Sequence, residues 1–104
     1  MLAAPDAKRP SLTMYYVYIL RSGKDGKLYI GSAPDLKKRL EKHQNGYVPA
    51  TKNRRPLRLV YYEAYIMPRD AQRRERYLKG GKGHGELKIQ LQETLKKIGY
   101  EYRV

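Results

Sequence analysis

The sequence predicts an α+β or mixed α/β domain in which helices pack on a short sheet. Two tyrosine-rich segments on either side of a glycine-containing turn predict a hairpin at the beginning of the fold. One more strand-like segment and several segments with helical spacing follow. At 104 residues, the chain has room for a single domain with one modest core.

The predicted hairpin consists of "MYYVYILR" (residues 14–21) and "LYIG" (residues 28–31), which are rich in residues that favour strands. Between them, "SGKDGK" supplies glycine and aspartate residues that tolerate the positive φ angles of tight turns. Residues 1–13 carry two prolines and no periodicity, so we expect a mobile tail there. Residues 14–104 are expected to form the single domain, and Met14 is an alternative start of the functional chain.

The first helix is expected within "SAPDLKKRLEKHQNG", residues 32–46. Ser32 is the expected N-cap, with Asp35 three residues later, Pro34 in the first turn and Gly46 after the last turn. The sequence therefore predicts a helix with both ends marked.

One face of this helix combines apolar and functional residue types. At about 100° per residue, Leu36, Leu40 and His43 share a face, and Arg39 borders it. A lone histidine on an apolar face is more often a hydrogen-bonded core residue than a catalytic one, so both roles stay open for His43. The permanent charge and five donors of Arg39 suit a phosphate oxygen.

The second half of the chain predicts one strand and two helices. A basic loop, "YVPATKNRRP", precedes the strand "LRLVYYEAY" (residues 57–65), and a helix runs from about Pro68 or Asp70 to Lys79. The glycine-rich segment "GGKGHG" (residues 80–85) is expected to break the chain. A last helix over about residues 86–98 should bury one apolar stripe and end at Gly99; the stripe consists of Leu87, Leu91, Leu95 and Ile98.

Glu75 occupies a position where the helical pattern calls for an apolar residue. Ala71, Glu75 and Leu78 follow the i, i+4, i+7 spacing of a buried stripe. A carboxylate there is costly to bury unless a cation or hydrogen-bond donors meet it. An ion pair with an arginine and a site for a divalent cation such as Mg²⁺ are the two interpretations.

The charge balance indicates a polyanionic partner. The chain has 23 Lys and Arg residues against 10 Asp and Glu residues, a formal net charge of +13. Such an excess favours DNA, with RNA as an alternative, although a solvated basic surface has the same composition. No apolar run approaches a membrane span and no secretory signal is evident, so we expect a cytoplasmic protein without a membrane partner. The absence of cysteine excludes disulfides and thiolate metal sites.

Tyr18 and Tyr29 lie near the middle of the two hairpin strands. Strand packing is the simplest explanation for them. If the hairpin register places Tyr18 opposite Tyr29, their hydroxyls come within reach of each other on one face of the sheet. A phenol has a reference pKa near 10, so it needs a nearby cation or imidazole to accept a proton at neutral pH.

These motifs together resemble the GIY-YIG nuclease superfamily, specifically its small stand-alone bacterial proteins related to the nuclease domain at the N-terminus of the excinuclease C protein. The resemblance covers about residues 15–83. It rests on ordered segments: "VYI" (residues 17–19), "YIG" (29–31), "DLKKRLEKH" (35–43), "RRPLRLVYYE" (54–63) and "AQRRERYLKGGKG" (71–83).

The resemblance implies the GIY-YIG endonuclease fold, which is a small three-stranded antiparallel sheet flanked by helices, with one site for Mg²⁺ or Mn²⁺. It implies that Arg39 steadies the phosphate, that His43 assists proton transfer and that Glu75 is the metal ligand. The motif tyrosines are Tyr18 and Tyr29, and the motif glycine is Gly31. Members differ in which tyrosine is the base, and Tyr18 is slightly favoured here. We expect the hydroxyl of Tyr29 to face the same pocket as the other four catalytic side chains.

The implied function is endonucleolytic cleavage of DNA in repair or in the processing of unusual DNA structures. The cations expected to contact nucleic acid are Lys38, Lys42, Lys52, Arg54, Arg55 and Arg74. The first motif has Val17 where the superfamily name has glycine, and no asparagine follows Asn53, although many members carry one after the metal-binding glutamate. A non-catalytic DNA- or RNA-binding module with the same fold is therefore the alternative. The chain has no separate DNA-binding domain, so a protein partner is one source of specificity.

Overall fold

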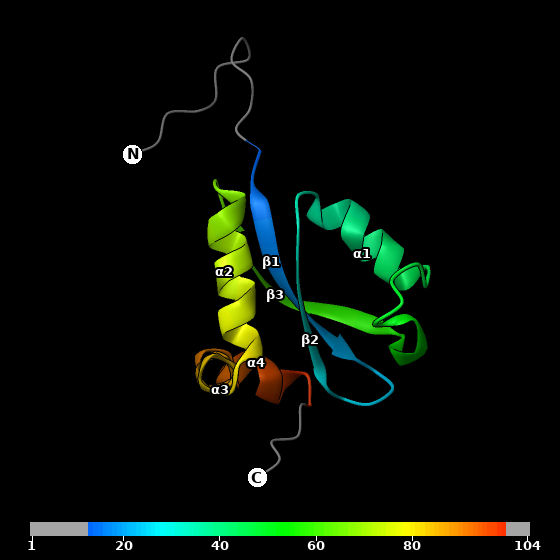
Figure 1. The fold of residues 1–104 in the computed structure, drawn as a ribbon. Coiled ribbons are helices and arrows are strands. Elements are labelled where there is room, and N and C mark those ends of the chain that lie inside the picture. Colours follow the sequence, from blue (N-terminus) through cyan, green and yellow to red (C-terminus); the bar gives the residue numbers. More distant parts are fainter. Residues whose placement is uncertain (1–12, 100–104) are drawn as a thin grey trace.

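The computed structural model describes residues 13–99, which form an antiparallel sheet flanked by helices (Figure 1). This arrangement confirms the predicted fold class. Of the predicted tail, residues 1–12 lie outside the described residues, as do residues 100–104 at the other end of the predicted domain. The elements in order are β1 (Tyr15–Ser22), β2 (Leu28–Ala33), α1 (Leu36–Gln44), η1 (Lys52–Arg54), β3 (Leu57–Tyr65), α2 (Pro68–Lys79), α3 (Gly81–Gln90) and α4 (Gln92–Lys97).

Within the described residues the sheet has three strands in the order β2-β1-β3, so β1 is central. In the hairpin, Tyr18 lies opposite Gly31, and Tyr29 lies opposite Leu20. The conditional register that would place Tyr18 opposite Tyr29 is therefore wrong. The turn sets this offset, because the amide of Ser22 donates to the carbonyl of Lys27 at 3.0 Å and closes the hairpin at that pair.

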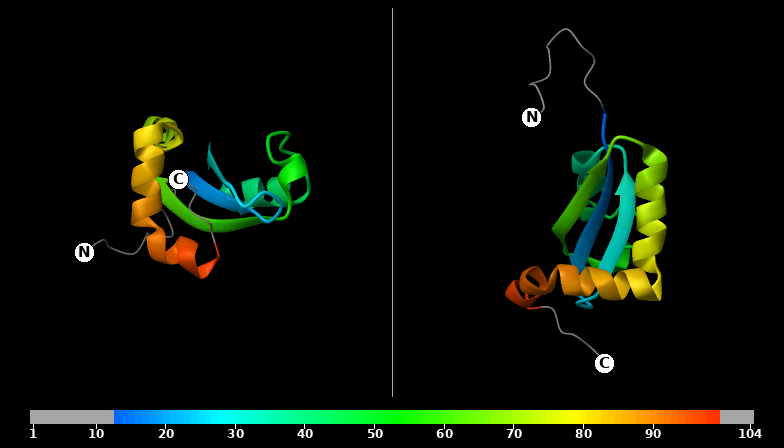
Figure 2. Two further views of the ribbon diagram at one scale, coloured as in Figure 1. Left: turned by 90° about the horizontal axis from the view of Figure 1, so that it is seen from below. Right: turned by 90° about the vertical axis from the view of Figure 1, so that its left-hand side faces the viewer.

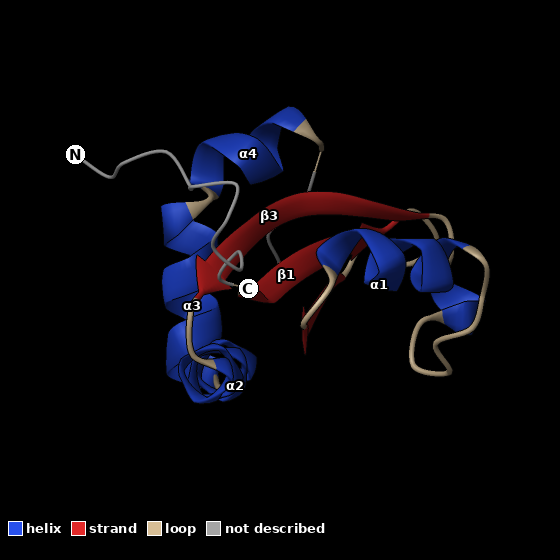
Figure 3. Cartoon of the chain, turned by 90° about the horizontal axis from the view of Figure 1, so that it is seen from above, coloured by secondary structure: helices blue, strands red, loops and turns tan. Residues whose placement is uncertain are grey.

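The two faces of the sheet carry different helices, because successive side chains of a strand point to opposite faces. Val17 and Ile19 pack with Ala71 and Leu78 of α2 and with buried leucines of α3 and α4. Tyr18 and Leu20, the alternating residues of β1, pack with residues of α1. Figures 2 and 3 show α1 on one side of the sheet and the three later helices around the other. No helix in this part of the chain is long and apolar enough to span a membrane.

The first helix begins later than the sequence predicts. Ser32 still belongs to β2, where it pairs with Val17, so its prediction as N-cap is wrong. Asp35 caps α1 instead, and its side chain accepts a hydrogen bond from the amide of Lys38 at 3.0 Å. The extended strand needs the backbone of Ser32 for pairing, which leaves the next capping residue, Asp35, to begin the helix. Gly46, with φ of 76°, follows the helix as predicted.

The glycine-rich segment is helical, which corrects the predicted break over residues 80–85. Gly80 alone leaves the helical conformation, and α3 begins at Gly81. Gly83 is buried where an added Cβ would collide with the backbone of Tyr77, so the small residue lets α3 start close to the end of α2. The predicted last helix is divided at Leu91 into α3 and α4, and its leucines are buried as expected. The bounds of β3 and α2 match the prediction.

Candidate active site

Tyr18, Tyr29 and His43 meet between the hairpin and α1, and we call them the tyrosine–histidine cluster. The hydroxyl of Tyr18 lies 2.7 Å from Nε2 of His43. The ring of Tyr29 packs against both partners, with centroid distances of 6.3 Å to Tyr18 and 5.2 Å to His43. Tyr18 and His43 are fully buried, whereas Tyr29 is half-buried. The structure therefore brings together three of the five predicted catalytic side chains in direct contact.

Gly31 makes room for this cluster. A Cβ added to Gly31 would lie 2.5 Å from the hydroxyl oxygen of Tyr18 and 2.6 Å from its Cζ. The Tyr18 ring thus lies directly against the backbone of the facing strand, which only glycine permits. The two motif residues are cross-strand partners, and this geometry explains why each strand carries the residue it does.

Arg39 extends the cluster from α1 and influences both buried groups. Burial is the main cause that raises the pKa of the Tyr18 hydroxyl well above its usual value. Tyr29 and the negative charge of Glu75 act in the same direction, and Arg39 acts against them. Burial and the positive charge of Arg39 lower the pKa of His43 to about 4. The imidazole is therefore neutral at pH 7, and one ring nitrogen carries a lone pair that can accept a hydrogen bond.

His43 has a second partner that the sequence did not identify. Its Nδ1 lies 2.7 Å from Oγ1 of Thr51, which is 0% exposed and belongs to the basic loop before η1. Thr51 is the one uncharged hydroxyl residue of "TKNRR" and follows His43 by eight positions. Because its neighbours are mostly basic, the sequence indicated an exposed loop here and gave no sign that the Thr51 side chain is buried.

Glu75 lies on α2, within the buried stripe that the helical pattern predicted. Ala71 and Leu78 of that stripe are 0% exposed, and the Glu75 side chain retains 20% exposure. Ser32 donates a hydrogen bond to Oε1 of Glu75, and Lys79 lies 2.5 Å from its Oε2. Burial by itself would raise the pKa of Glu75, but these two hydrogen bonds and the charges of Lys79 and Arg76 lower it below the usual value. Glu75 is therefore a carboxylate at pH 7.

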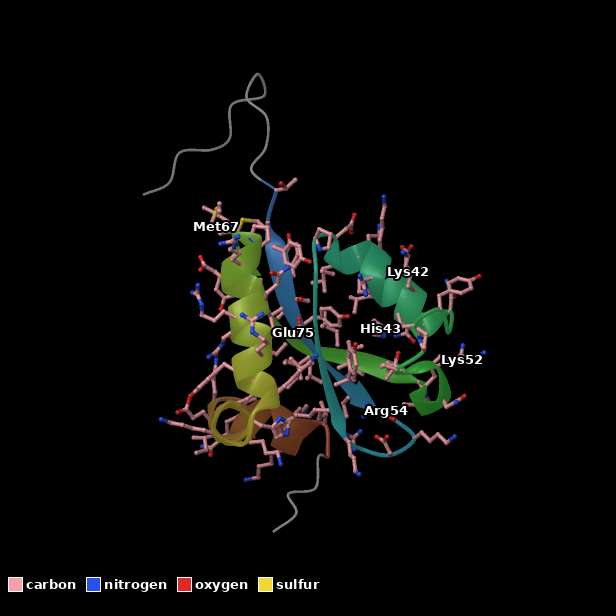
Figure 4. The ribbon with its side chains drawn as sticks, viewed as in Figure 1. Lys42, His43, Lys52, Arg54, Met67 and Glu75 are labelled. Atoms are coloured by element: carbon pink, nitrogen blue, oxygen red, sulfur yellow. The ribbon has the colours of Figure 1, made fainter. Side chains whose placement is uncertain are left out.

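The predicted catalytic residues approach β2 from both faces. Gly31 and Ser32 are adjacent, so Tyr18 lies against β2 from the α1 face and Glu75 reaches it from the α2 face. Figure 4 shows Glu75 on the α2 side of β2 and His43 on the α1 side. The expectation that Tyr29 and Glu75 face one pocket is corrected accordingly, because α1 and α2 cover opposite faces. Packing thus remains an alternative role for Tyr29.

The residues around Glu75 fit a hard divalent cation held mainly by substrate and water. Within residues 13–99, no group of three or more His, Cys, Asp and Glu side chains could hold a metal ion. Mg²⁺ often uses only one or two protein carboxylates, with phosphate oxygens and water in its other positions. The Glu75 carboxylate, with the hydroxyl of Ser32 beside it, provides such oxygen donors, provided that Lys79 moves aside.

The six cations predicted to contact nucleic acid fall into two groups. The three lysines, Lys38, Lys42 and Lys52, are exposed, as is Arg55. The three arginines are held by the protein: Arg54 pairs with Asp25 at 2.7 Å, Arg74 pairs with Glu63 at 3.0 Å, and Arg55 donates to the carbonyls of Lys52 and Gln44. The Arg74 network joins α2 to β3, which favours a structural role for that residue.

The sequence of residues 14–88 matches the GIY-YIG catalytic domain family. A UPF0213 protein of Clostridium perfringens is 38% identical over 92 residues, which cover 88% of this chain and 98% of that protein. UPF0213 proteins of Staphylococcus saprophyticus and Staphylococcus epidermidis are 42% and 41% identical over 76 residues, covering 72% of this chain and 92% of each relative. The family match covers most of the described residues, and the relatives align over most of this chain. The chain therefore belongs to the GIY-YIG nuclease superfamily and resembles its small bacterial members.

Proposed function

We propose that the protein is a Mg²⁺- or Mn²⁺-dependent endonuclease that hydrolyses phosphodiester bonds of DNA. One observation carries the proposal: the tyrosine–histidine cluster and the carboxylate of Glu75 converge on the adjacent residues Gly31 and Ser32 of β2, an edge strand. Tyr, Arg, His and Glu are the residue types that move a proton, stabilise phosphate charge and hold a hard cation. The proposed substrate position is the edge of β2 between α1 and α2.

Each side chain has a role that follows from its surroundings. Arg39 would bind a phosphate oxygen and stabilise the charge that develops on it. We assign the contact with the attacking water to Tyr29, because Tyr18 is 1% exposed and its hydroxyl is engaged with His43. Tyr29 would reach that water around the edge of β2, since Glu75 approaches this strand from the other face. This assignment departs from the preference for Tyr18 that the sequence suggests, and burial is the reason.

Glu75 would hold the metal ion, with Ser32 orienting its carboxylate through the hydrogen bond to Oε1. When bound, the cation would supply Lewis-acid stabilisation of the scissile phosphate and of the leaving oxygen. The side chain of Lys79 must leave Oε2 of Glu75 for both carboxylate oxygens to become available. The exposed lysines of α1 and of the basic loop would contact the DNA backbone.

The alternative function is a non-catalytic module that binds DNA or RNA. The ion pair between Lys79 and Glu75 favours it, because a cationic side chain already satisfies part of the carboxylate. The lack of an asparagine after Asn53 points in the same direction.

Repair or processing of branched DNA in the cytoplasm is the cellular setting that we propose for the nuclease, with a protein partner as one source of specificity.

Cleavage of end-labelled duplex, branched and flapped DNA, with labelled RNA in parallel, tests the proposal. Reactions with Mg²⁺, with Mn²⁺ and with a chelator should show cleavage only when a cation is present. Glu75→Ala and Arg39→Ala should each lower kcat by about a hundredfold or more, because each removes a group that acts on the transition state. Binding of DNA by Glu75→Ala should persist.

Matched controls are Glu41→Ala on α1 and Arg69→Ala on α2, which remove exposed side chains of the same charges. Both should cleave at the wild-type rate. Wild-type activity that survives in Glu75→Ala and Arg39→Ala would overturn the assignment of the site. Binding without cleavage under every condition would overturn the nuclease proposal and support the non-catalytic module.

A further inference from the structure

We infer that Thr51 is a positioning residue of the site, and that its hydroxyl fixes the His43 tautomer in which Nδ1 carries the proton and Nε2 accepts from Tyr18. The three side chains form a buried chain of hydrogen bonds, with 2.7 Å from Tyr18 to Nε2 and 2.7 Å from Nδ1 to Thr51. Each of them is 1% exposed or less. Since Tyr29 only packs against this chain, the inference rests on the contacts of Thr51 and not on those of Tyr29.

The direction of the hydrogen bonds follows from counting protons. When His43 is neutral, Tyr18, His43 and Thr51 each have one proton to donate along this chain. The Tyr18 proton then has Nε2 of His43 as its acceptor, which requires Nε2 to be unprotonated. Nδ1–H in turn donates to Oγ1 of Thr51, whose own proton points to the carbonyl of Val48 at 3.5 Å.

The opposite direction leaves a buried proton without an acceptor. If Thr51 donated to Nδ1, it would give up the carbonyl of Val48, and Nε2–H would donate to the Tyr18 oxygen. The hydroxyl proton of Tyr18 would then have no acceptor among the described contacts, at a site that is 1% exposed. A buried hydroxyl that cannot donate loses a substantial fraction of its hydration energy. The first direction satisfies every proton in the chain.

A defined tautomer matters for the orientation of Tyr18. An unprotonated Nε2 accepts a hydrogen bond from the Tyr18 hydroxyl and fixes where that hydroxyl points, whereas Nε2–H would donate to it. The groups that face His43 are Tyr18 from β1, Tyr29 from β2, Arg39 from its own helix and Thr51 from the loop after α1. Of these, Thr51 is the one that contacts Nδ1, so it decides which nitrogen carries the proton.

The direct test is long-range ¹H–¹⁵N NMR of the imidazole rings in the DNA-free protein at pH 7. The chain has two histidines, and a His84→Gln variant assigns the spectrum. We expect a protonated Nδ1 and an unprotonated Nε2 for His43 in the wild type and in Thr51→Ser. Thr51→Val, which removes the hydroxyl while it keeps the branched shape, should give the Nε2–H form or a mixture.

A wild-type spectrum with Nε2 protonated would overturn the inference, as would an unchanged tautomer in a folded Thr51→Val variant. The wild-type measurement needs no variant to fold and no nuclease activity. It is therefore independent of the proposed function, on which only the catalytic consequence rests. If cleavage is established, Thr51→Val should lower kcat by at least about tenfold with little change in KM, and Thr51→Ser should restore it. Equal losses in both variants would overturn the catalytic consequence.

Discussion

A glycine and a tyrosine on facing strands determine how closely the residues of the candidate site pack. Gly31 has no side chain, so the Tyr18 ring occupies that space and its hydroxyl lies within hydrogen-bond distance of His43. His43 in turn is held by Thr51 from a loop. The chemistry of the cluster therefore depends on single atoms, and substitutions of one methyl or one hydroxyl group can test it.

Gly31→Ala should destabilise the protein and disrupt the cluster. The added Cβ would lie 2.5 Å from the Tyr18 oxygen, so the ring or the strand must shift. Such overpacking costs about 1–3 kcal/mol in the free energy of unfolding, which urea denaturation measures. Gly85→Ala is the matched control, because a Cβ there meets no atom within 4 Å and the residue lies inside α3. It should be neutral or stabilising by up to about 1 kcal/mol. Equal stability of the two variants would contradict the tight fit.

The buried His43 should make stability depend on pH. Burial and Arg39 lower its folded-state pKa from the usual 6.5 to about 4. Between these values the unfolded chain binds a proton that the folded chain does not, so the free energy of unfolding falls as the pH drops from 6.5 toward 4. The expected loss is up to about 3 kcal/mol, measured by urea denaturation at pH 7.5 and pH 4.5.

His43→Gln should remove most of this pH dependence, and the difference from the wild type isolates the contribution of the one imidazole. His84→Gln changes the other histidine and should keep the wild-type dependence. A wild-type curve that runs parallel to that of His43→Gln would show that the imidazole titrates normally in the folded state.

Among the elements, α2 is anchored to β3 by a polar network as well as by its apolar stripe. Glu63 accepts hydrogen bonds from the hydroxyls of Tyr61 and Tyr65 at 2.7 and 2.6 Å. Arg74 of α2 adds bonds to both carboxylate oxygens, at 3.0 and 3.1 Å. Burial alone would raise the pKa of Glu63, but these donors lower it below its usual value. The network fixes the rotation of the helix that presents Glu75.

Glu63→Gln should therefore lower the free energy of unfolding by about 1–3 kcal/mol. An amide nitrogen would replace one of the two oxygens that accept hydrogen bonds from the tyrosine hydroxyls and from Arg74. Thermal or urea unfolding measures the loss. The control is Asp70→Asn, which removes the exposed ion pair with Arg73 and should change stability by no more than about 0.5 kcal/mol. A Glu63→Gln variant as stable as Asp70→Asn would mean that the apolar stripe alone orients α2.

The whole molecule combines a net charge of +13 with a site between two helices (Figure 1). If DNA binding is electrostatic and covers about five phosphates, the logarithm of the association constant should fall with the logarithm of the salt concentration at a slope of about −4.5. Replacing Lys38, Lys42 and Lys52 together by glutamine should bring the slope to about −1.8, because each phosphate contact contributes about −0.9. Fluorescence anisotropy at several salt concentrations measures both slopes.

The control for this measurement is Lys96→Gln with Lys97→Gln, on α4 and away from α1. This double variant should keep the wild-type slope. A slope that is flat in the wild type would contradict the electrostatic argument, and equal changes in the two sets of variants would show that no particular face binds the DNA.

Local patterns determined the elements themselves. The bounds of β3 and α2 follow from residue composition and spacing, and the helical spacing alone showed the misfit of Glu75 in an apolar stripe. The helical spacing also marked Arg39 and His43 on one turn, and the resemblance to the GIY-YIG family identified Tyr18 and Tyr29 as motif residues. These features depend on interactions within a few residues, which the sequence displays directly.

The tertiary structure decided what the local patterns left open. Hairpin closure at Ser22 placed Gly31 opposite Tyr18, and strand pairing kept Ser32 out of α1. Close packing on Tyr77 made the glycine-rich segment helical, where glycine propensity predicted a break. The contact of Thr51 with His43 and the approach of Glu75 to β2 from the opposite face depend on segments far apart in the chain. Such contacts follow from global packing, which outweighs local propensity and leaves no periodic signal in the sequence.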